Sequence, residues 1–162
     1  MKDIWIANDH GGYQLKLVLL DHLQKQGIAC RDMGSEGEEI VRYPYYAALV
    51  ADAVSRGEIE RGILICSTGI GMSIIANKYP GVRAAQCRTT YDARMTRAHN
   101  NANVLCLGGK TVGPFEALDM LDAWLNTEYM GGRHDISLGL IEEAEAVNLT
   151  GARWSPGLEN ML

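Results

Sequence analysis

Long apolar runs, excess positive charge and paired cysteines are all missing from this 162-residue sequence, and each absence excludes a class of protein. No run of about 18 apolar residues occurs, so we expect no membrane-spanning helix. The first residues, MKDIWIANDH, lack the long apolar core of a signal peptide, which favours a cytoplasmic protein. The formal net charge of −5 provides no overall positive field for a nucleic acid or an anionic membrane. An anionic substrate would therefore need a local cluster of positive groups.

The sequence also lacks the spacing patterns of disulfides, metal sites and nucleotide sites. Its four cysteines are far apart and form no C-x-x-C pair: Cys30, Cys66, Cys87 and Cys106. In a reducing compartment each is a thiol that either packs in the core or reacts. No pair of histidines or acids has a helical metal-ligand spacing, so we expect no metal. Neither of the glycine-rich nucleotide fingerprints is present, which argues against a nucleotide-binding protein.

Short apolar runs alternate with helical patterns along the chain. Strands are predicted at residues 4–7, 28–33, 62–66, 82–87 and 103–107. Helices are predicted at about residues 15–26, 44–54, 90–99, 114–124 and 136–147, and a short helix is predicted after the loop 67–73, to about residue 78. Alternating strands and helices require right-handed crossovers, and they predict an α/β fold with a five-stranded parallel sheet flanked by helices. The length predicts a single domain over residues 1–148, followed by an irregular tail over 149–162.

In such a sheet the ligand site lies beyond the carboxyl ends of the strands. Three polar clusters are expected at that edge: residues 8–12, 66–73 and 89–103. Their convergence is more informative than any one of them, because each alone also has a purely structural interpretation.

The loop Ser67-Thr68-Gly69-Ile70-Gly71-Met72-Ser73 joins a predicted strand to a helix. Its glycines and the unpaired amides of the helix N-terminus suit an anion, although a plain tight turn is the competing interpretation. Cys66 directly precedes this loop. The positive end of a helix dipole would favour its thiolate as a base or nucleophile, whereas the competing interpretation is a buried structural cysteine. The other three cysteines are interpreted as packing residues.

Several further residues have both a structural and a functional interpretation. Asp9 is expected either to cap the N-terminus of a helix or to act as a catalytic residue. His10, which stands beside two glycines, could bind an anion. His99 and Asn100 follow Arg94 and Arg97 at a helix end, which also fits a solvated basic terminus. A glycine pair before Arg133 indicates a turn that presents this arginine.

Together these residues resemble the type B ribose-5-phosphate isomerase family, which also contains galactose-6-phosphate and allose-6-phosphate isomerases. The resemblance extends over about residues 2–147, in order and at the family spacing. The matching stretches are Asn8–Gly12, Tyr43-Pro44, Gly62–Ser73, Ala76–Lys78, Val82–Ala84, His99-Asn100, Asn103–Leu105 and Gly131–His134.

This resemblance implies a Rossmann-like three-layer fold, no cofactor, and a homodimer, possibly paired into a tetramer, with active sites shared between subunits. It implies an aldose–ketose isomerase that moves a proton through an enediolate, with ribose 5-phosphate to ribulose 5-phosphate as the default reaction. The implied catalytic residues are Cys66 as the base, with Asp9, Thr68 and His99 assisting ring opening and His99 expected to come from the partner subunit. The implied substrate-binding residues are His10, Tyr43, Ser67, Gly69, Ile70, Gly71, Met72, Ser73, Asn100, Lys110 and Arg133.

Three departures concern the part of the pattern that holds phosphate. Ser137 stands where the family commonly has a second arginine, and Lys110 replaces an arginine after the fifth strand. Arg42 stands where the family often has an acid. A four- or six-carbon sugar phosphate is therefore a competing hypothesis for the substrate. Two hypotheses from different classes are a non-catalytic sugar-phosphate-binding subunit and a flavodoxin-like nucleotide-binding or redox protein.

Overall fold

A computed structural model describes residues 4–152 of the chain. The chain divides into two compact units, residues 1–129 and residues 130–162. This division falls inside the range 1–148 that the sequence predicts as one domain. Most of the predicted tail lies outside the described residues, so both predicted boundaries stay predictions.

The first unit is built on a five-stranded, fully parallel sheet, which confirms the predicted fold class. Its strands are β1 (Ile4–Asn8), β2 (Cys30–Asp32), β3 (Gly62–Cys66), β4 (Ala84–Gln86) and β5 (Val104–Gly108). They lie in the order β2-β1-β3-β5-β4. The two edge strands, β2 and β4, are shorter than the sequence predicts: each pairs with one neighbouring strand among the described residues, and the paired register extends over three residues.

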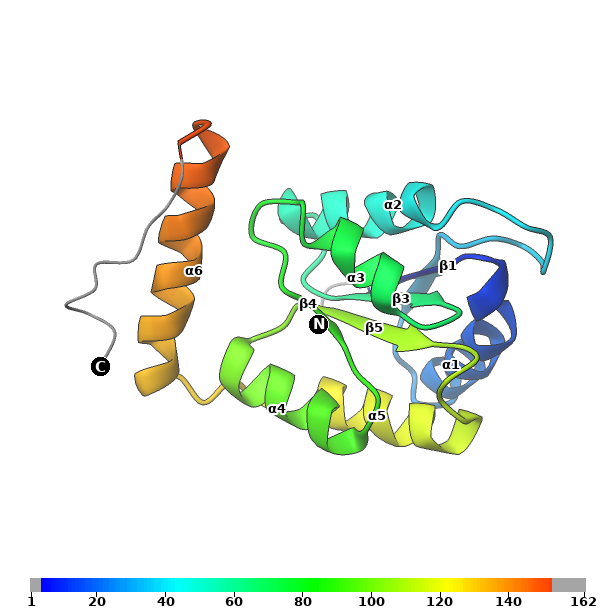
Figure 1. The fold of residues 1–162 in the computed structure, drawn as a ribbon. Coiled ribbons are helices and arrows are strands. Elements are labelled where there is room, and N and C mark those ends of the chain that lie inside the picture. Colours follow the sequence, from blue (N-terminus) through cyan, green and yellow to red (C-terminus); the bar gives the residue numbers. More distant parts are fainter. Residues whose placement is uncertain (1–3, 153–162) are drawn as a thin grey trace. The chain divides into compact units, whose positions relative to one another are not determined.

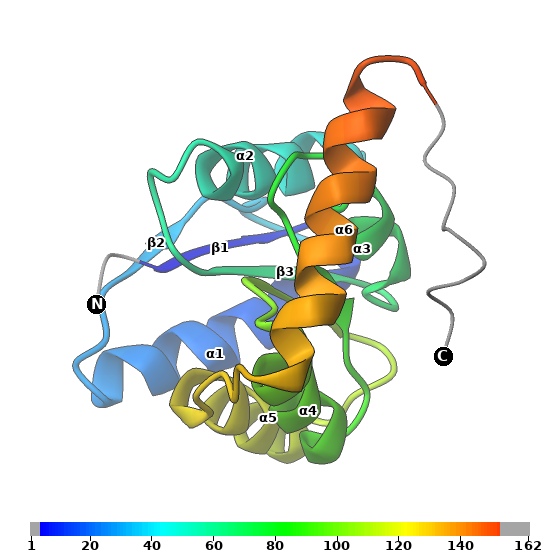
Figure 2. The same ribbon diagram turned by 90° about the vertical axis from the view of Figure 1, so that its left-hand side faces the viewer.

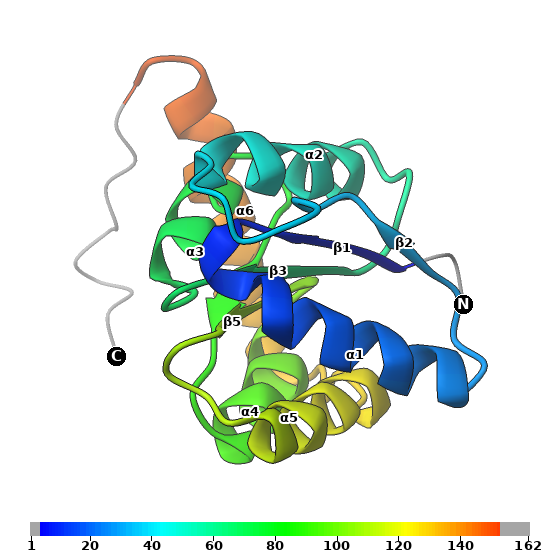
Figure 3. The same ribbon diagram turned by 90° about the vertical axis from the view of Figure 1, so that its right-hand side faces the viewer.

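Helices cover both faces of this sheet and complete the predicted three layers. They are α1 (Tyr13–Lys25), α2 (Tyr43–Ser55), α3 (Ile70–Ala76), α4 (Thr90–Asn100) and α5 (Pro114–Asn126). A short 3-10 helix, η1 (His10–Gly12), precedes α1. Helices α2 and α3 lie on one face, and α1, α4 and α5 lie on the other (Figures 1 and 3). Prolines in the first turns of α2 and α5 match the predicted starts.

The side chains of β3 show how the two faces are divided. Ile63 and Ile65 pack in the core under α1, α4 and α5, whereas Leu64 and Cys66 pack in the core under α2 and α3. This alternation follows from the two-residue period of a strand. It places the Cys66 side chain on the α2–α3 side, at the carboxyl end of the strand next to α3.

The prediction that residues 89–103 gather at the carboxyl edge is wrong for the second half of that range. Helix α4 starts beside the carboxyl end of β4 and runs back for about 16 Å to the amino edge (Figure 1). Its last residue, Asn100, accepts a hydrogen bond through its carbonyl from Arg83 Nε over 3.1 Å. Arg83 directly precedes β4. His99 and Asn100 therefore lie at the opposite end of the sheet from Cys66 of the same chain.

The second unit contains α6 (Arg133–Leu149), which contains the helix predicted at residues 136–147 (Figure 2). It has no buried residue within its own unit and exposes Ile136, Leu140 and Ile141. Among residues 4–152, none of the helices is long and apolar enough to span a bilayer.

Candidate active site

Loops that follow β1, β3 and β5 meet at the carboxyl edge of the sheet. The amide of Asp9 donates a hydrogen bond to a carbonyl of β3 over 3.1 Å. The amides of Gly109 and Lys110 donate to the carbonyls of Cys66 and Ser67 over 2.8 and 3.0 Å. Backbone hydrogen bonds thus fix the three loops relative to one another.

Cys66 directs its sulfur towards the glycine loop. The residue is only 6% exposed, and its Sγ accepts a hydrogen bond from the Gly69 amide over 3.1 Å. A backbone amide that donates to sulfur suits a thiolate, because charged acceptors form the stronger hydrogen bonds. The sulfur is therefore at the predicted loop and not surrounded by core side chains alone.

Two other cysteines are held as thiols. Burial raises the pKa of Cys87 to about 12, and the carboxylate of Asp92 contributes to this rise. Burial also raises the pKa of Cys106 well above its ordinary value, and the neighbouring Cys87 and Cys66 add to this effect. Both side chains pack in the hydrophobic core, as the sequence predicts. At neutral pH neither can act as a base.

Two glycines give the loop its shape. Gly69 has a left-handed backbone with φ of 78°, and a Cβ there would lie 3.0 Å from the backbone of Leu107. A Cβ on Gly71 would lie 2.9 Å from the ring of Tyr43. Gly69 therefore requires glycine, whereas a side chain at position 71 would displace the Tyr43 ring. The second contact also shows that the aromatic ring of Tyr43 packs directly on the first turn of α3.

Three of the five backbone amides between residues 69 and 73 are used within the loop itself: those of Gly69, Ile70 and Ser73. The amide of Ile70 donates to Thr68 Oγ1 over 3.3 Å, and Gln86 Nε2 donates to the Thr68 carbonyl over 3.2 Å. Two amides have no acceptor within residues 4–152: those of Gly71 and Met72. These two amides are available to an oxygen of a ligand.

Asp9 and His10 are positioned by η1. Oδ1 of the buried Asp9 accepts from the Gly11 amide over 2.8 Å, which confirms its interpretation as an N-cap. His10 Nδ1 lies 4.0 Å from the other Asp9 carboxylate oxygen and accepts from the Val41 amide over 3.3 Å. In the neutral ring this assignment leaves the proton on Nε2, which can then donate to a ligand.

Positive groups lie beside the loops without being buried. Arg42 is the N-cap residue of α2 next to Tyr43, and both are exposed. Lys110 follows β5 and has an exposed side chain. Ser67 lies against η1, since a Cβ on Gly11 would lie 2.8 Å from the Ser67 amide nitrogen. The structure therefore brings these predicted residues to the same edge.

Lys16 is a residue of this region that the sequence analysis missed. It is 2% exposed, and its Nζ lies 2.9 Å from Asp32 Oδ2 and donates to the Ser35 carbonyl over 2.7 Å. Asn8 Nδ2 also binds Ser35, through its Oγ over 3.0 Å. The available signal was a lysine in the apolar face of the first helix, directly after Leu15. Lys16 holds the segment that leads to Val41 and α2.

The remaining predicted residues lie elsewhere. His99 and Asn100 are at the amino edge of the sheet. Arg133 is the first residue of α6 in the second unit, and Ser137 lies one turn later in the same helix. Among residues 4–152, no group of three histidine, cysteine or acidic side chains could hold a metal ion.

The model of the Ribose/Galactose Isomerase family matches residues 4–141. Ribose-5-phosphate isomerase B of Escherichia coli is 46% identical over 134 residues, which cover 83% of this chain and 90% of that protein. D-erythrulose-4-phosphate isomerase of Pectobacterium atrosepticum is 43% identical over 82% of this chain and 88% of that protein.

A solved structure, that of Clostridium thermocellum ribose-5-phosphate isomerase B, has the same fold. It superimposes with a TM-score of 0.87 at 51% identity, covering 89% of this chain and 97% of that chain. The match confirms the resemblance that the sequence motifs indicate. The chain therefore belongs to the ribose/galactose isomerase family, and the predicted enzyme class, an aldose–ketose isomerase, is confirmed.

Proposed function

We propose that this chain interconverts ribose 5-phosphate and ribulose 5-phosphate by moving a proton between C2 and C1 through an enediolate. The observation that carries this proposal is the juxtaposition in one loop of the Cys66 sulfur and two unpaired amides, those of Gly71 and Met72. A base and oxygen-directed donors are what proton abstraction beside a carbonyl requires.

In the proposed reaction the Cys66 thiolate takes the C2 proton of the open-chain aldose. The electron pair of the broken C–H bond forms the C1–C2 double bond, and the carbonyl pair moves onto O1. A proton passes from O2 to O1, the O2 carbonyl forms, and the Cys66 thiol returns its proton to C1. The amides of Gly71 and Met72 would stabilise the charged oxygen, an interaction typically worth roughly 3–4 kcal/mol per donor.

Ring opening is assigned to Asp9, Thr68 and His99. Within one chain His99 and Asn100 are at the wrong edge of the sheet to reach Cys66. The proposal therefore requires a second copy of the chain to supply both residues, which makes the active unit a homodimer. Tyr43, Ser67 and Asn100 would orient the sugar, and His10, Lys110 and Arg133 would bind the phosphate.

We also propose that the enzyme works in a reducing compartment such as the cytoplasm. All four cysteines lie within the described residues, and none of them forms a disulfide. A catalytic thiolate at Cys66 needs the same reducing conditions, since oxidation would remove the base.

A four-carbon sugar phosphate is the second candidate substrate. One relative that is 43% identical carries the name D-erythrulose-4-phosphate isomerase. Ser137, with its shorter uncharged side chain, and the added Arg42 change the positive groups that would meet the substrate. Turnover assays with four-, five- and six-carbon sugar phosphates decide between the substrates, and the highest kcat/KM identifies the preferred one.

The mechanism is tested by exchange of the C2 proton of ribose 5-phosphate in D2O. We expect Cys66→Ala to lower the exchange rate by at least about 1,000-fold while substrate binding by calorimetry survives. Cys87→Ala is the matched control: it also removes a buried sulfur, but we expect exchange to continue. Full exchange in Cys66→Ala would eliminate Cys66 as the base.

A further inference from the structure

A polar pocket opens at the amino edge of the sheet, at the opposite edge from the catalytic loop. Its volume is about 310 Å³. Three guanidinium groups and two amide side chains line it, together with Val54, Ile59 and Glu60: Arg61, Arg83, Arg97, Asn101 and Asn103. Nothing in the proposed reaction uses these arginines.

Strand register brings part of this lining together. Arg61, Asn103 and Arg83 directly precede β3, β5 and β4, which are neighbours in the sheet. The first residues of these strands are paired, Gly62 with Val104 and Ala84 with Val104. The three preceding residues therefore occupy equivalent positions on adjacent strands, which lie about 4.8 Å apart.

Backbone carbonyls fix the direction of each guanidinium group. Arg61 Nη1 donates to the Leu125 carbonyl over 2.8 Å, and Arg97 Nη1 donates to the Ala102 carbonyl over 2.7 Å. Arg83 Nε donates to the Asn101 carbonyl over 3.1 Å. Each arginine thus uses only some of its five N–H donors in hydrogen bonds to the protein backbone, and none of these bonds involves an Nη2 atom.

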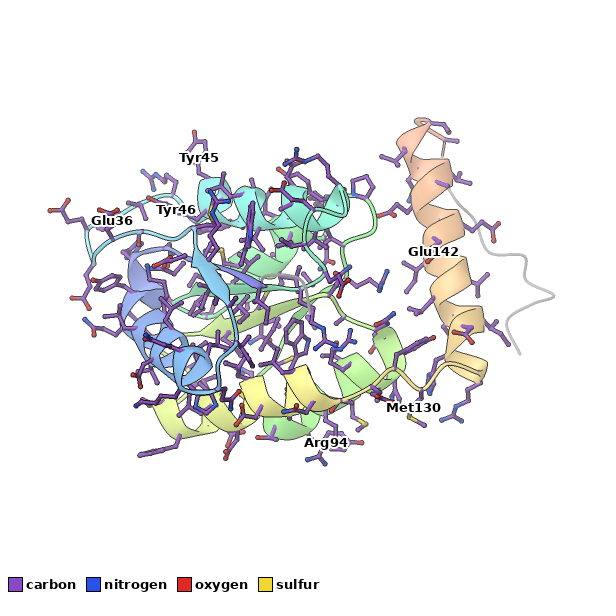
Figure 4. The ribbon with its side chains drawn as sticks, turned by 180° about the vertical axis from the view of Figure 1, so that it is seen from behind. Glu36, Tyr45, Tyr46, Arg94, Met130 and Glu142 are labelled. Carbon is purple, nitrogen blue, oxygen red and sulfur yellow. The ribbon has the colours of Figure 1, made fainter. Side chains whose placement is uncertain are left out.

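The three positive charges have one neighbouring carboxylate in the pocket lining, that of Glu60, which partly offsets the lowering of the Arg61 pKa by burial. No carboxylate among residues 4–152 forms an ion pair with Arg61, Arg83 or Arg97. Arg97 is only 7% exposed, and its Nε atom is buried without a hydrogen-bond partner. Arg94, one turn earlier in α4, instead projects away from the sheet (Figure 4).

The charges also repel one another. The pKa of Arg97 is lowered to about 10, first by burial and then by the positive charges of Arg61 and Arg83. Arg61 and Arg97 both lie over the ring of Trp124, at 5.5 and 6.0 Å. A bound anion would relieve the repulsion and satisfy the unused donors.

We propose that this pocket binds a phosphate group through Arg61, Arg83 and Arg97, at a site separate from the catalytic loop. Guanidinium forks match the geometry of phosphate oxygens, and the pocket volume suits inorganic phosphate or a small phosphate ester. At the end of α4, next to His99, Arg83 donates to the carbonyl of Asn100 and Arg97 donates to the side-chain oxygen of Asn101. A ligand here would therefore contact the helix end that presents His99.

The test is an NMR titration of the full-length protein with inorganic phosphate, in which the buried Nε–H resonance of Arg97 is observed. We expect a saturable shift that sodium chloride at equal ionic strength does not produce. Arg61→Gln should raise the phosphate concentration at half-saturation about tenfold, because it removes one charge-assisted contact. The matched control is Arg31→Gln, which removes an arginine that lies over another tryptophan, 4.8 Å from the Trp5 ring. It should leave the titration unchanged.

An Arg97 resonance that does not move, or equal half-saturation in Arg61→Gln and the unmodified protein, would overturn the proposal. Glycerol phosphate is titrated in parallel. Tighter binding of glycerol phosphate than of inorganic phosphate supports a phosphorylated metabolite as the ligand, and equal binding supports phosphate itself. The experiment involves no turnover, so its result does not depend on the proposed isomerase mechanism.

Discussion

The cysteines show how the surroundings of one residue type decide its chemistry. Cys66 meets a backbone amide at a strand end, whereas burial raises the pKa of Cys87 and Cys106 so far that they stay protonated. The sequence places Cys66 before a glycine loop, which made it a candidate base or nucleophile, and the family resemblance implied the role of base. The amide on its sulfur depends on the left-handed turn at Gly69, which only coordinates show.

Gly71 tests the contact between α3 and Tyr43. Gly71→Ala puts a methyl group where a Cβ would lie 2.9 Å from the ring, so the ring must move. We expect KM to rise several-fold, because Tyr43 no longer orients the sugar, together with a loss of about 1–3 kcal/mol of stability. Gly113→Ala is the matched control, since a Cβ there meets nothing within 4 Å. Steady-state kinetics that are identical in both variants would contradict the assignment of Tyr43.

Arg133 tests how the phosphate is held. A phosphate contact binds ground state and transition state alike, so Arg133→Ala should raise KM for ribose 5-phosphate by about tenfold or more with little change in kcat. Arg88→Ala, another exposed arginine, should leave both constants unchanged. If KM does not change in Arg133→Ala, Arg42 or Lys110 is the phosphate contact.

Among the elements, the segment between β2 and α2 depends on a side chain from α1. Lys16 is buried and binds both Asp32 and the Ser35 carbonyl, and this segment carries the Val41 amide that binds His10. A buried lysine is a strong restraint because its charge must stay paired. The segment therefore has a fixed path even though it contains no helix or strand.

Lys16→Met tests this restraint. The substitution keeps the volume but removes the hydrogen bonds, so we expect a loss of about 1–3 kcal/mol in unfolding free energy and a several-fold higher KM. Lys25→Met on the same helix removes only an exposed pair with Asp21 and should change neither quantity measurably. Urea denaturation and kinetics of both variants provide the measurement. Equal stability of the two would contradict the role of Lys16.

The predicted strands and helices agree with the structure because their apolar periods are clear, as in Gly62–Cys66, which the sequence predicts residue for residue. The errors concern the positions at which strands and helices end. The sequence does not show which strands are edges, so β2 and β4 were predicted too long. It also does not show how far α4 extends, so the whole range 89–103 was expected at the carboxyl edge of the sheet.

At the scale of the whole molecule, the predicted catalytic residues lie far apart, because α4 carries His99 away from the edge of the sheet where Cys66 lies. Cys66 and His99 of one chain lie at opposite edges of the sheet. The motifs could identify both residues, but whether they meet depends on assembly, which single-chain periodicity does not encode. The same holds for Arg133, which belongs to the second unit.

Mixing two inactive variants tests the shared site. Cys66→Ala and His99→Ala homodimers should each have little activity. After unfolding and refolding together, about half of the dimers are mixed, and each mixed dimer contains one site with both residues intact. We expect recovery of about a quarter of the unmodified activity. Refolding each variant alone is the control. No recovery in the mixture would show that both residues act within the same chain.

The strand order has a consequence for how the chain folds. Among the described strands, β4 pairs only with β5, which comes later in the sequence, so a growing chain cannot place β4 until residues 104–108 have been made. Gln86 of β4 binds the Thr68 carbonyl in the glycine loop. The loop beside Cys66 is thus completed late in biosynthesis, and in fragments ending before residue 104 the strand that carries Gln86 would have no partner strand.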